Sequence, residues 1–190
     1  QDFRARRFGP IDRLIYRQQA ELVDLHPGSE QATQVLRDLE RFSAHTRLSA
    51  MLVGYLLSRL PADPQRPAVA LELCAGSGWL SRGMARRAAA TGRPIRLLAS
   101  DLRAPMSALA DVQWHLADAL RLPLRDQSVD LVFCVNSLHH FTPIQASRLL
   151  EEASRVGRVV CIYDLRRTLF GAALTGVAAL LYSRAFARDS

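Results

Sequence analysis

The sequence predicts an α/β fold, a doubly wound parallel sheet that follows a group of helices. After residue 67, short runs rich in Val, Ile and Leu alternate with helical segments or long crossovers, which is typical of a parallel sheet with helices on both faces. Before residue 61, apolar residues recur at helical spacing, as in Val35, Leu36 and Leu39. A proline-rich link at 61–67 separates the two patterns, so we expect a helical cap or lid over 1–66 and a sheet domain over 67–190.

Capping and turn residues mark where the expected helices begin and end. Ser29 can cap a helix in the N-terminal part of the chain. In the sheet domain one helix begins at Trp79 and ends near Gly92, and Thr142 can cap another that has Pro143 at its first position. The five expected strands lie at 67–74, 95–100, 112–117, 129–136 and 158–165.

The composition favours a globular protein and argues against several kinds of partner. The chain has 190 residues, 49% of them apolar, and a net charge of +7 from 25 basic residues that are all Arg. These arginines are scattered, with neither an aromatic-interleaved basic run nor zinc spacing, so we expect neither nucleic-acid binding nor a metal site. Cys74, Cys134 and Cys161 lie in apolar strand-like runs and are predicted to be reduced structural thiols. No signal peptide is visible, so a cytoplasmic location is expected.

The stretch 169–182 has no charged residue over its 14 positions and has arginines on both sides. It is shorter than the roughly 20 residues that a helix needs to span a bilayer. We therefore expect a buried helix, or an interfacial helix that makes peripheral contact with a membrane.

Polar side chains stand where the expected strands end. Glu72 and a glycine-containing loop follow the first strand, Asp101 the second, Asp118 the third and Asn136 the fourth. Parallel sheets of this kind bind ligands beyond the carboxyl ends of their strands, and glycines let the backbone approach a ligand closely. For each residue the structural alternative is a helix cap or a tight turn.

Four stretches together make the chain resemble a class I S-adenosylmethionine-dependent methyltransferase with a Rossmann-like fold. They are LELCAGSG at 71–78, SDL at 100–102, ADALRLPLRDQSVDLVFCVNSLHHF at 117–141 and SRVGRVVCIYDL at 154–165. The resemblance covers about 68–165 and is nearest to the small-molecule type that includes ubiquinone and menaquinone biosynthesis methyltransferases. It implies S-adenosyl-L-methionine as methyl donor and S-adenosyl-L-homocysteine as product.

The resemblance also implies which residues hold the cofactor. Glu72, Gly76 and Gly78 would hold its methionine part, Asp101 its ribose and Asp118 its adenine. The neighbouring residues that complete the expected cofactor-binding set are Cys74, Ala75, Leu102, Ala119 and Asn136.

The chain departs from the family pattern in two places. Cys74 stands where the family usually has glycine, and the family sheet normally finishes with an antiparallel hairpin after the fifth strand, whereas only about a helix's worth of residues follows Asp164. The sequence is therefore expected to be C-terminally incomplete or to complete its sheet edge by other means, such as a homodimer. A further resemblance, to methyltransferases that accompany type III polyketide synthases, implies phenolic, quinone-like or polyketide acceptors.

His139 and His140 are the candidate catalytic bases, because histidine has an ordinary pKa close to neutral. The structural alternative is a helix start in which one imidazole bonds to the backbone and the other faces solvent.

Two other functions are consistent with the sequence. One is a nicotinamide-dependent oxidoreductase, whose fingerprint calls for glycine or alanine where Ser81 stands. The other is a non-catalytic or membrane-surface protein that retains the fold, which the stretch 169–182 favours.

Overall fold

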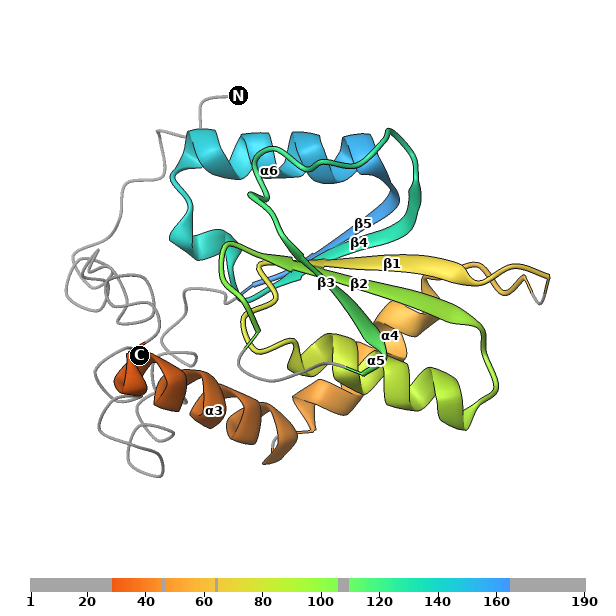
Figure 1. The fold of residues 1–190 in the computed structure, drawn as a ribbon, viewed down its shortest axis with the longest axis horizontal. Coiled ribbons are helices and arrows are strands. Elements are labelled where there is room, and N and C mark those ends of the chain that lie inside the picture. The colour runs from red at the N-terminus through yellow and green to blue at the C-terminus, as the bar shows by residue number, and fades with distance from the viewer. Residues whose placement is uncertain (1–28, 46, 64, 106–109, 165–190) are drawn as a thin grey trace, which may run out of the picture. The chain divides into compact units, whose positions relative to one another are not determined.

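The computed structural model describes residues 29–164, except 46, 64 and 106–109 (Figure 1). Contacts divide the chain into two units, and the described residues from Leu36 to Asp164 belong to one of them. The expectations for 169–182 lie outside the described residues. No helix among the described residues is long and apolar enough to cross a membrane.

The sheet has five parallel strands in the order β3-β2-β1-β4-β5. This confirms the predicted doubly wound parallel sheet. Figure 1 shows α6 on one face of the sheet and α4 and α5 on the other. The strands are β1 (Ala68–Leu73), β2 (Ile95–Asp101), β3 (Val112–Leu116), β4 (Val129–Val135) and β5 (Gly157–Tyr163). The helices are α3 (Glu30–His45), α4 (Leu48–Ser58), α5 (Trp79–Ala90) and α6 (Pro143–Val156), with a short 3-10 helix, η2 (Leu138–His140).

Alternate side chains of the strands fill two hydrophobic layers. In β4, Leu131 and Phe133 enter the layer on the α4 and α5 side, whereas Val132 and Cys134 enter the layer on the α6 side. All four side chains are fully buried, because a strand covered on both faces has no solvent-facing side. This explains why the strand reads as an unbroken apolar run in the sequence.

The predicted helix boundaries are confirmed by their capping contacts. Ser29 Oγ accepts a hydrogen bond from the Ala32 main chain at 3.1 Å. Thr142 and Gln145 form a reciprocal capping box at the start of α6. Gly92 takes a positive φ of 64° directly after the C-cap of α5, the conformation that favours glycine there.

Helix α4 packs on the face of the sheet, beside α5. Leu52, Val53 and Leu56 are buried in the same cluster as Leu80 and Met84 of α5. The helical spacing of these apolar residues therefore reflects core packing. A separate cap over 1–66 stays a prediction.

A buried ion cluster lies where the strands begin, at the amino-terminal end of the sheet. Asp130 is 5% exposed and accepts hydrogen bonds from Arg66 at 2.8 and 2.9 Å, Arg158 at 3.0 Å and the Val69 main chain at 2.9 Å. The bonds from Arg66, opposed in part by burial, hold the pKa of Asp130 below its ordinary value. The cluster connects three neighbouring segments. These are β4, β5 and the link that precedes β1.

Asp130→Ala is expected to lower the free energy of unfolding by about 2 kcal/mol, because the buried Val69 N–H loses its acceptor and both arginines lose their charged partner. Urea denaturation monitored by circular dichroism measures the change. The matched control is Asp111→Ala at an exposed aspartate, expected within about 0.5 kcal/mol of the parent. Equal losses for both variants would contradict a stabilising role for the cluster.

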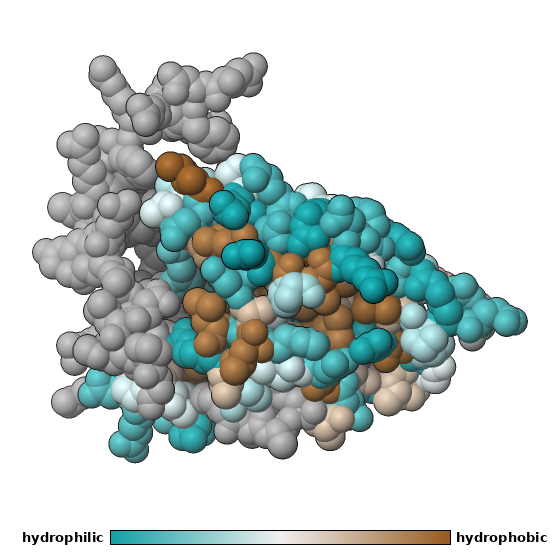
Figure 2. Space-filling model, turned by 45° about the horizontal axis from the view of Figure 1, so that its top comes forward, coloured by the Kyte–Doolittle hydropathy of each residue, from teal (hydrophilic) through white to brown (hydrophobic). Residues whose placement is uncertain are grey.

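The surface mixes apolar and polar side chains. On the face shown in Figure 2, hydrophobic patches lie between hydrophilic side chains. Among the described residues, Ile144 is 84% exposed and Leu102 is 75% exposed. Leu102 directly follows Asp101 at the end of β2, so one of the most exposed apolar side chains stands at the carboxyl edge of the sheet.

Candidate cofactor and active site

The strand order brings the predicted site residues to one edge of the sheet. The sheet has β3, β2, β1 and β4 side by side in this order. The carboxyl ends of these strands are therefore adjacent, and each has one predicted site residue at or just beyond it: in the same order, Asp118, Asp101, Glu72 and Asn136. The charge of Asp101 acts on both Glu72 and Cys74, and that of Asp118 acts on Cys74. The three carboxylates therefore gather around the loop after β1.

Glu72 lies inside the protein and has a hydrogen-bonding partner in α5. It is 4% exposed, and one carboxylate oxygen accepts from the Ser81 main chain at 3.1 Å and from Ser81 Oγ at 2.5 Å. Burial raises the pKa of Glu72 from 4.5 to about 7, against the lowering effect of the two Ser81 bonds. Ser81 thus satisfies the polar group whose burial at the end of a strand is otherwise unfavourable.

Asp101 holds the glycine loop in place. Its Oδ2 accepts from the Gly76 main chain at 2.9 Å and its Oδ1 from the Arg103 main chain at 3.1 Å. Gly76 and Gly78 both take positive φ, 56° and 69°, the left-handed region that favours glycine. The loop therefore turns sharply between β1 and α5 and brings main-chain groups close to the carboxyl edge.

Cys74 also takes a positive φ, 54°, which explains why a glycine suits this position. Hydrogen bonding with the neighbouring Cys134 thiol, together with burial, raises the pKa of Cys74. All three cysteines are free thiols. Cys74 is therefore a packed, protonated side chain in the loop.

Helix α3 contacts the same loop and the start of α5 through residues in its middle, Leu36 and Glu40. A Cβ built on Gly76 would lie 3.6 Å from Leu36 Cδ2. Arg82 bonds to Glu40 of α3 at 2.5 Å and donates to the Ser77 carbonyl at 3.0 Å. Of the predicted helical cap, the middle of α3 is therefore a described part that reaches the loop.

His139 is held by a carboxylate from the next strand. Asp164, which follows β5, accepts the His139 main-chain N–H at 3.0 Å through Oδ2, and its Oδ1 lies 2.6 Å from His139 Nδ1. In the neutral tautomer that has its proton on Nδ1, the ring donates to Asp164, and Nε2 has the lone pair. The His140 ring lies against it, with centroids 4.2 Å apart. The structure thus distinguishes the two predicted histidines.

Residues 70–159 match the model of a family described as a methyltransferase domain. This match spans the glycine loop, all three carboxylates and both histidines. Residues 70–159 are similar in sequence to a methyltransferase domain, and the sheet and helices around them have the fold of a class I methyltransferase.

Solved structures share the fold of this methyltransferase domain. A candidate methyltransferase from an antibiotic biosynthesis pathway of Anabaena variabilis is 20% identical, with a TM-score of 0.50 over 70% of this chain and 56% of that chain. The PH0226 protein of Pyrococcus horikoshii is 18% identical, with a TM-score of 0.50 over 81% of this chain and 63% of that chain. The chain thus spans less than two thirds of the length of either structure. No curated protein matches it significantly.

Two buried polar atoms of the methyltransferase domain fit a bound cofactor. Ser77 Oγ and Asn136 Oδ1 are buried and have no hydrogen-bond partner among the residues that the structure describes. Ser77 lies between the two loop glycines, and Asn136 directly follows β4 with a φ of 52°. Buried polar atoms are normally paired, so both are free to bond with a ligand at this edge.

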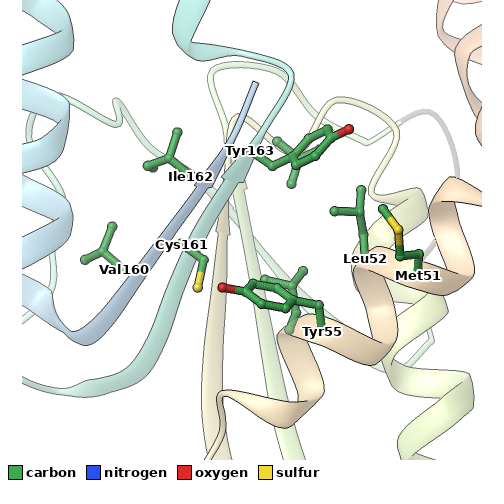
Figure 3. A pocket seen from close by; sticks show the side chains of 9 residues that line it. Met51, Leu52, Tyr55, Val160, Cys161, Ile162 and Tyr163 are labelled. Carbon is green, nitrogen blue, oxygen red and sulfur yellow. The ribbon is translucent and has the colours of Figure 1, made fainter. Parts of the chain in front are cut away.

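An apolar pocket of about 460 Å³ lies between α4 and the edge strand β5 of the methyltransferase domain (Figure 3). Among the described strands β5 pairs only with β4, so the pocket follows the open edge of the sheet. None of the predicted cofactor-binding residues lines it. Its lining has no charged side chain and consists of Met51, Leu52, Tyr55, Leu56, Val135, Val160, Cys161, Ile162 and Tyr163.

Sequence reasoning missed three partners of the site residues: Ser81, Arg82 and Asp164. Asp164 carries the same signal as the other acids, since it stands at the carboxyl end of a predicted strand. Ser81 and Arg82 lie on α5, where the sequence alone does not show which side chains turn back towards β1 and the loop. Among the described residues, no group of three potential ligands could hold a metal ion.

Proposed function

We propose that the domain is an S-adenosylmethionine-dependent methyltransferase whose acceptor is a small molecule with a removable proton. The observation that carries the proposal is the placement of a carboxylate-held histidine, His139, at the same sheet edge as the glycine loop and three acidic residues. The family match supports the reaction class. The donor and the acceptor class are our proposals.

The chain offers separate groups for each part of the donor. The loop from Gly76 to Gly78, with the unpartnered Ser77 hydroxyl, would hold the methionine part. Asp101 keeps free lone pairs on its two oxygens for a ribose diol. Asp118 is exposed next to the buried Ala119, so its carboxylate is accessible to the exocyclic amine of adenine.

When bound, S-adenosylmethionine supplies an electrophilic methyl group on a sulfonium. Placing an acceptor atom in line with that group can contribute roughly 7–11 kcal/mol to catalysis. His139 Nε2 would take the proton of the acceptor, while Asp164 holds the ring and stabilises the imidazolium that forms. A base is useful only for acceptors that lose a proton, which favours phenolic, quinol or polyketide hydroxyls and activated ring carbons.

Binding of the donor is the first test. We expect S-adenosylmethionine and S-adenosylhomocysteine to raise the melting temperature, with about 2.7 kcal/mol of stabilisation at 100 times Kd. NADH at the same concentration should leave the melting temperature unchanged. The reverse pattern would support the nicotinamide-dependent rival and overturn the proposal.

Transfer to an acceptor is the second part of the same test. Labelled methyl groups from S-adenosylmethionine are followed into a panel that contains an alkylresorcinol, a benzoquinol and a polyhydroxylated polyketide. The proposal expects turnover of at least one member, dependent on Asp101 and Asp118. Donor binding without transfer to any member would favour a protein that keeps the fold without this activity.

A further inference from the structure

We propose that Glu152 and Arg155 of α6 are positioning residues that set the affinity for the adenosyl group by holding the loop that presents Asp118. The inference rests on the proposed function, because it takes Asp118 as the partner of adenine. It assigns a role in binding to two residues that lie outside the predicted site.

The loop between β3 and β4 presents Asp118 at its start. The Leu120 main chain donates to Asp118 Oδ1 at 2.9 Å, and the Arg121 main chain donates to the Asp118 carbonyl at 2.9 Å. These bonds form a tight turn directly after β3. The position of the carboxylate therefore depends on where the next residues of the loop are fixed.

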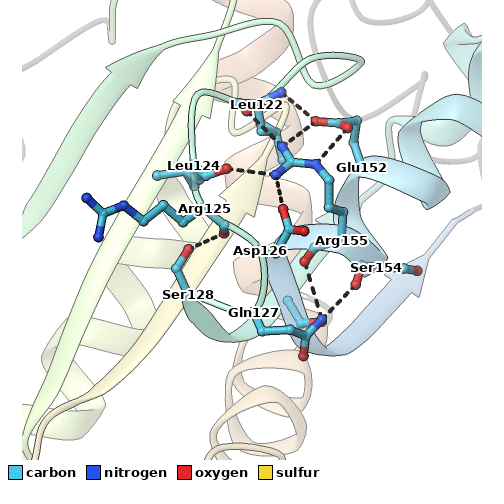
Figure 4. A network of polar contacts seen from close by, with 10 residues as sticks. Leu122, Leu124, Arg125, Asp126, Gln127, Ser128, Glu152, Ser154 and Arg155 are labelled. Atoms are coloured by element: carbon cyan, nitrogen blue, oxygen red, sulfur yellow. Dashed lines mark hydrogen bonds and ion pairs between the residues drawn. The ribbon is translucent and has the colours of Figure 1, made fainter.

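Leu122 is that fixed point. Its N–H donates to Glu152 Oε2 at 2.9 Å, and its carbonyl accepts from Arg155 at 2.9 Å (Figure 4). Its side chain is 4% exposed and packs in the same cluster as Leu149, Ala153 and Val156. Both main-chain polar groups and the side chain of one residue are thus held by a single helix.

Arg155 extends the hold further along the loop. It donates to the Leu124 carbonyl at 2.8 Å and to Asp126 Oδ1 at 2.7 Å. Glu152, three residues earlier on α6, accepts two bonds from the same guanidinium at 2.8 and 2.9 Å. The planar five-donor group of arginine matches this set of carbonyls and carboxylates, which a lysine ammonium cannot reproduce.

The pair stays charged between pH 5 and pH 9. The bonds to Arg155 lower the pKa of Glu152 from 4.5 to about 2, and the bonds to Glu152 and Asp126 raise the pKa of Arg155. The hydrogen bonds that Glu152 and Arg155 make to the loop should therefore be the same at pH 5 and pH 9.

The carboxylate of Asp118 is four residues from Leu122, with the buried Ala119 between them. A small shift of the loop therefore moves the predicted adenine contact, and displacements of about 1 Å can reduce function about a hundredfold. Because the pair touches neither the glycine loop nor His139, its loss should affect binding of the adenosyl group and leave the transfer step unchanged.

Isothermal titration with S-adenosylhomocysteine tests the inference on the full chain. We expect Arg155→Gln, Arg155→Lys and Glu152→Gln each to raise Kd about tenfold. The matched control is Arg125→Gln in the same loop, where the side chain is exposed and points away from the network (Figure 4), and its Kd should stay within twofold of the parent.

A double-mutant cycle separates positioning from general stability. In the Asp118→Asn background, Arg155→Gln should change Kd less than twofold, although it still lowers the melting temperature. An undiminished effect of Arg155→Gln in that background, or a lowered melting temperature with unchanged Kd in the single variant, would overturn the inference. If the parent protein itself does not bind S-adenosylhomocysteine, the proposed function fails instead.

Discussion

His139→Gln is expected to lower the rate of methyl transfer about 10²–10⁴-fold, the usual contribution of a positioned general base. Glutamine keeps a polar side chain of similar length, but its amide cannot take a proton from the acceptor. The hydrogen bond from the main-chain N–H of residue 139 to Asp164 Oδ2 does not involve the histidine side chain. The local backbone should therefore stay in place in the variant. Single-turnover transfer to the best acceptor of the panel measures the loss.

Asp164→Asn should cause a loss of the same kind through the ring it holds. When Asp164 is ionised, its oxygen 2.6 Å from His139 Nδ1 can accept a hydrogen bond but cannot donate one. The amide of asparagine can donate to Nδ1 instead, which moves the ring proton to Nε2 and removes the lone pair that the proposed base uses. Kd for S-adenosylhomocysteine should stay within threefold of the parent.

His140→Gln is the matched control, because this neighbouring ring stacks on His139. Its rate should remain within a few fold of the parent. The rate of the parent should depend on pH more strongly than the remaining rate of His139→Gln, because only the parent has a histidine at this position. If His139→Gln, Asp164→Asn and His140→Gln all kept the rate of the parent, placement of the acceptor alone would account for catalysis, and the proposed base would be wrong.

Much of the fold could be predicted from local patterns. The strand that contains Leu131 and Phe133 is apolar on both faces, and only a parallel sheet between two helical layers gives every side chain a buried position. Gly76, Gly78 and Gly92 were expected to form turns, and each has a positive φ. Once the strands are known to be parallel, their carboxyl ends must share one edge, so the gathering of Glu72 and Asp101 follows from the pattern.

The parts that could not be predicted depend on contacts distant in sequence. Helical spacing in α4 shows that one face is apolar, but it does not show whether that face packs on the sheet or covers the strand ends. His139 and His140 are adjacent and chemically identical, and what distinguishes them is Asp164, 25 residues later. The hold of α6 on Leu122 likewise spans 30 residues, and neither residue type nor spacing indicates it.

Glu72→Gln is expected to remove a pH dependence of about 3 kcal/mol from the free energy of unfolding. The pKa of Glu72 is about 7 in the folded protein and 4.5 as the ordinary value. Between these two pH values the unfolded chain has released a proton that the folded chain still binds, so stability falls as pH rises. Each unit of difference corresponds to about 1.4 kcal/mol, and above pH 7 no further loss occurs.

The comparison of parent and variant across this window isolates Glu72 from other titrating groups. The glutamine side chain of the variant has no proton to lose, and its carbonyl oxygen can still accept from Ser81. The stability of Glu72→Gln relative to the parent should therefore grow by about 3 kcal/mol between pH 4.5 and 7.5 in urea denaturation at constant ionic strength. Glu151→Gln at an exposed position should change by less than about 0.5 kcal/mol. A constant difference for Glu72→Gln would show that this buried carboxylate is already ionised at pH 4.5, held in that state by the two bonds from Ser81.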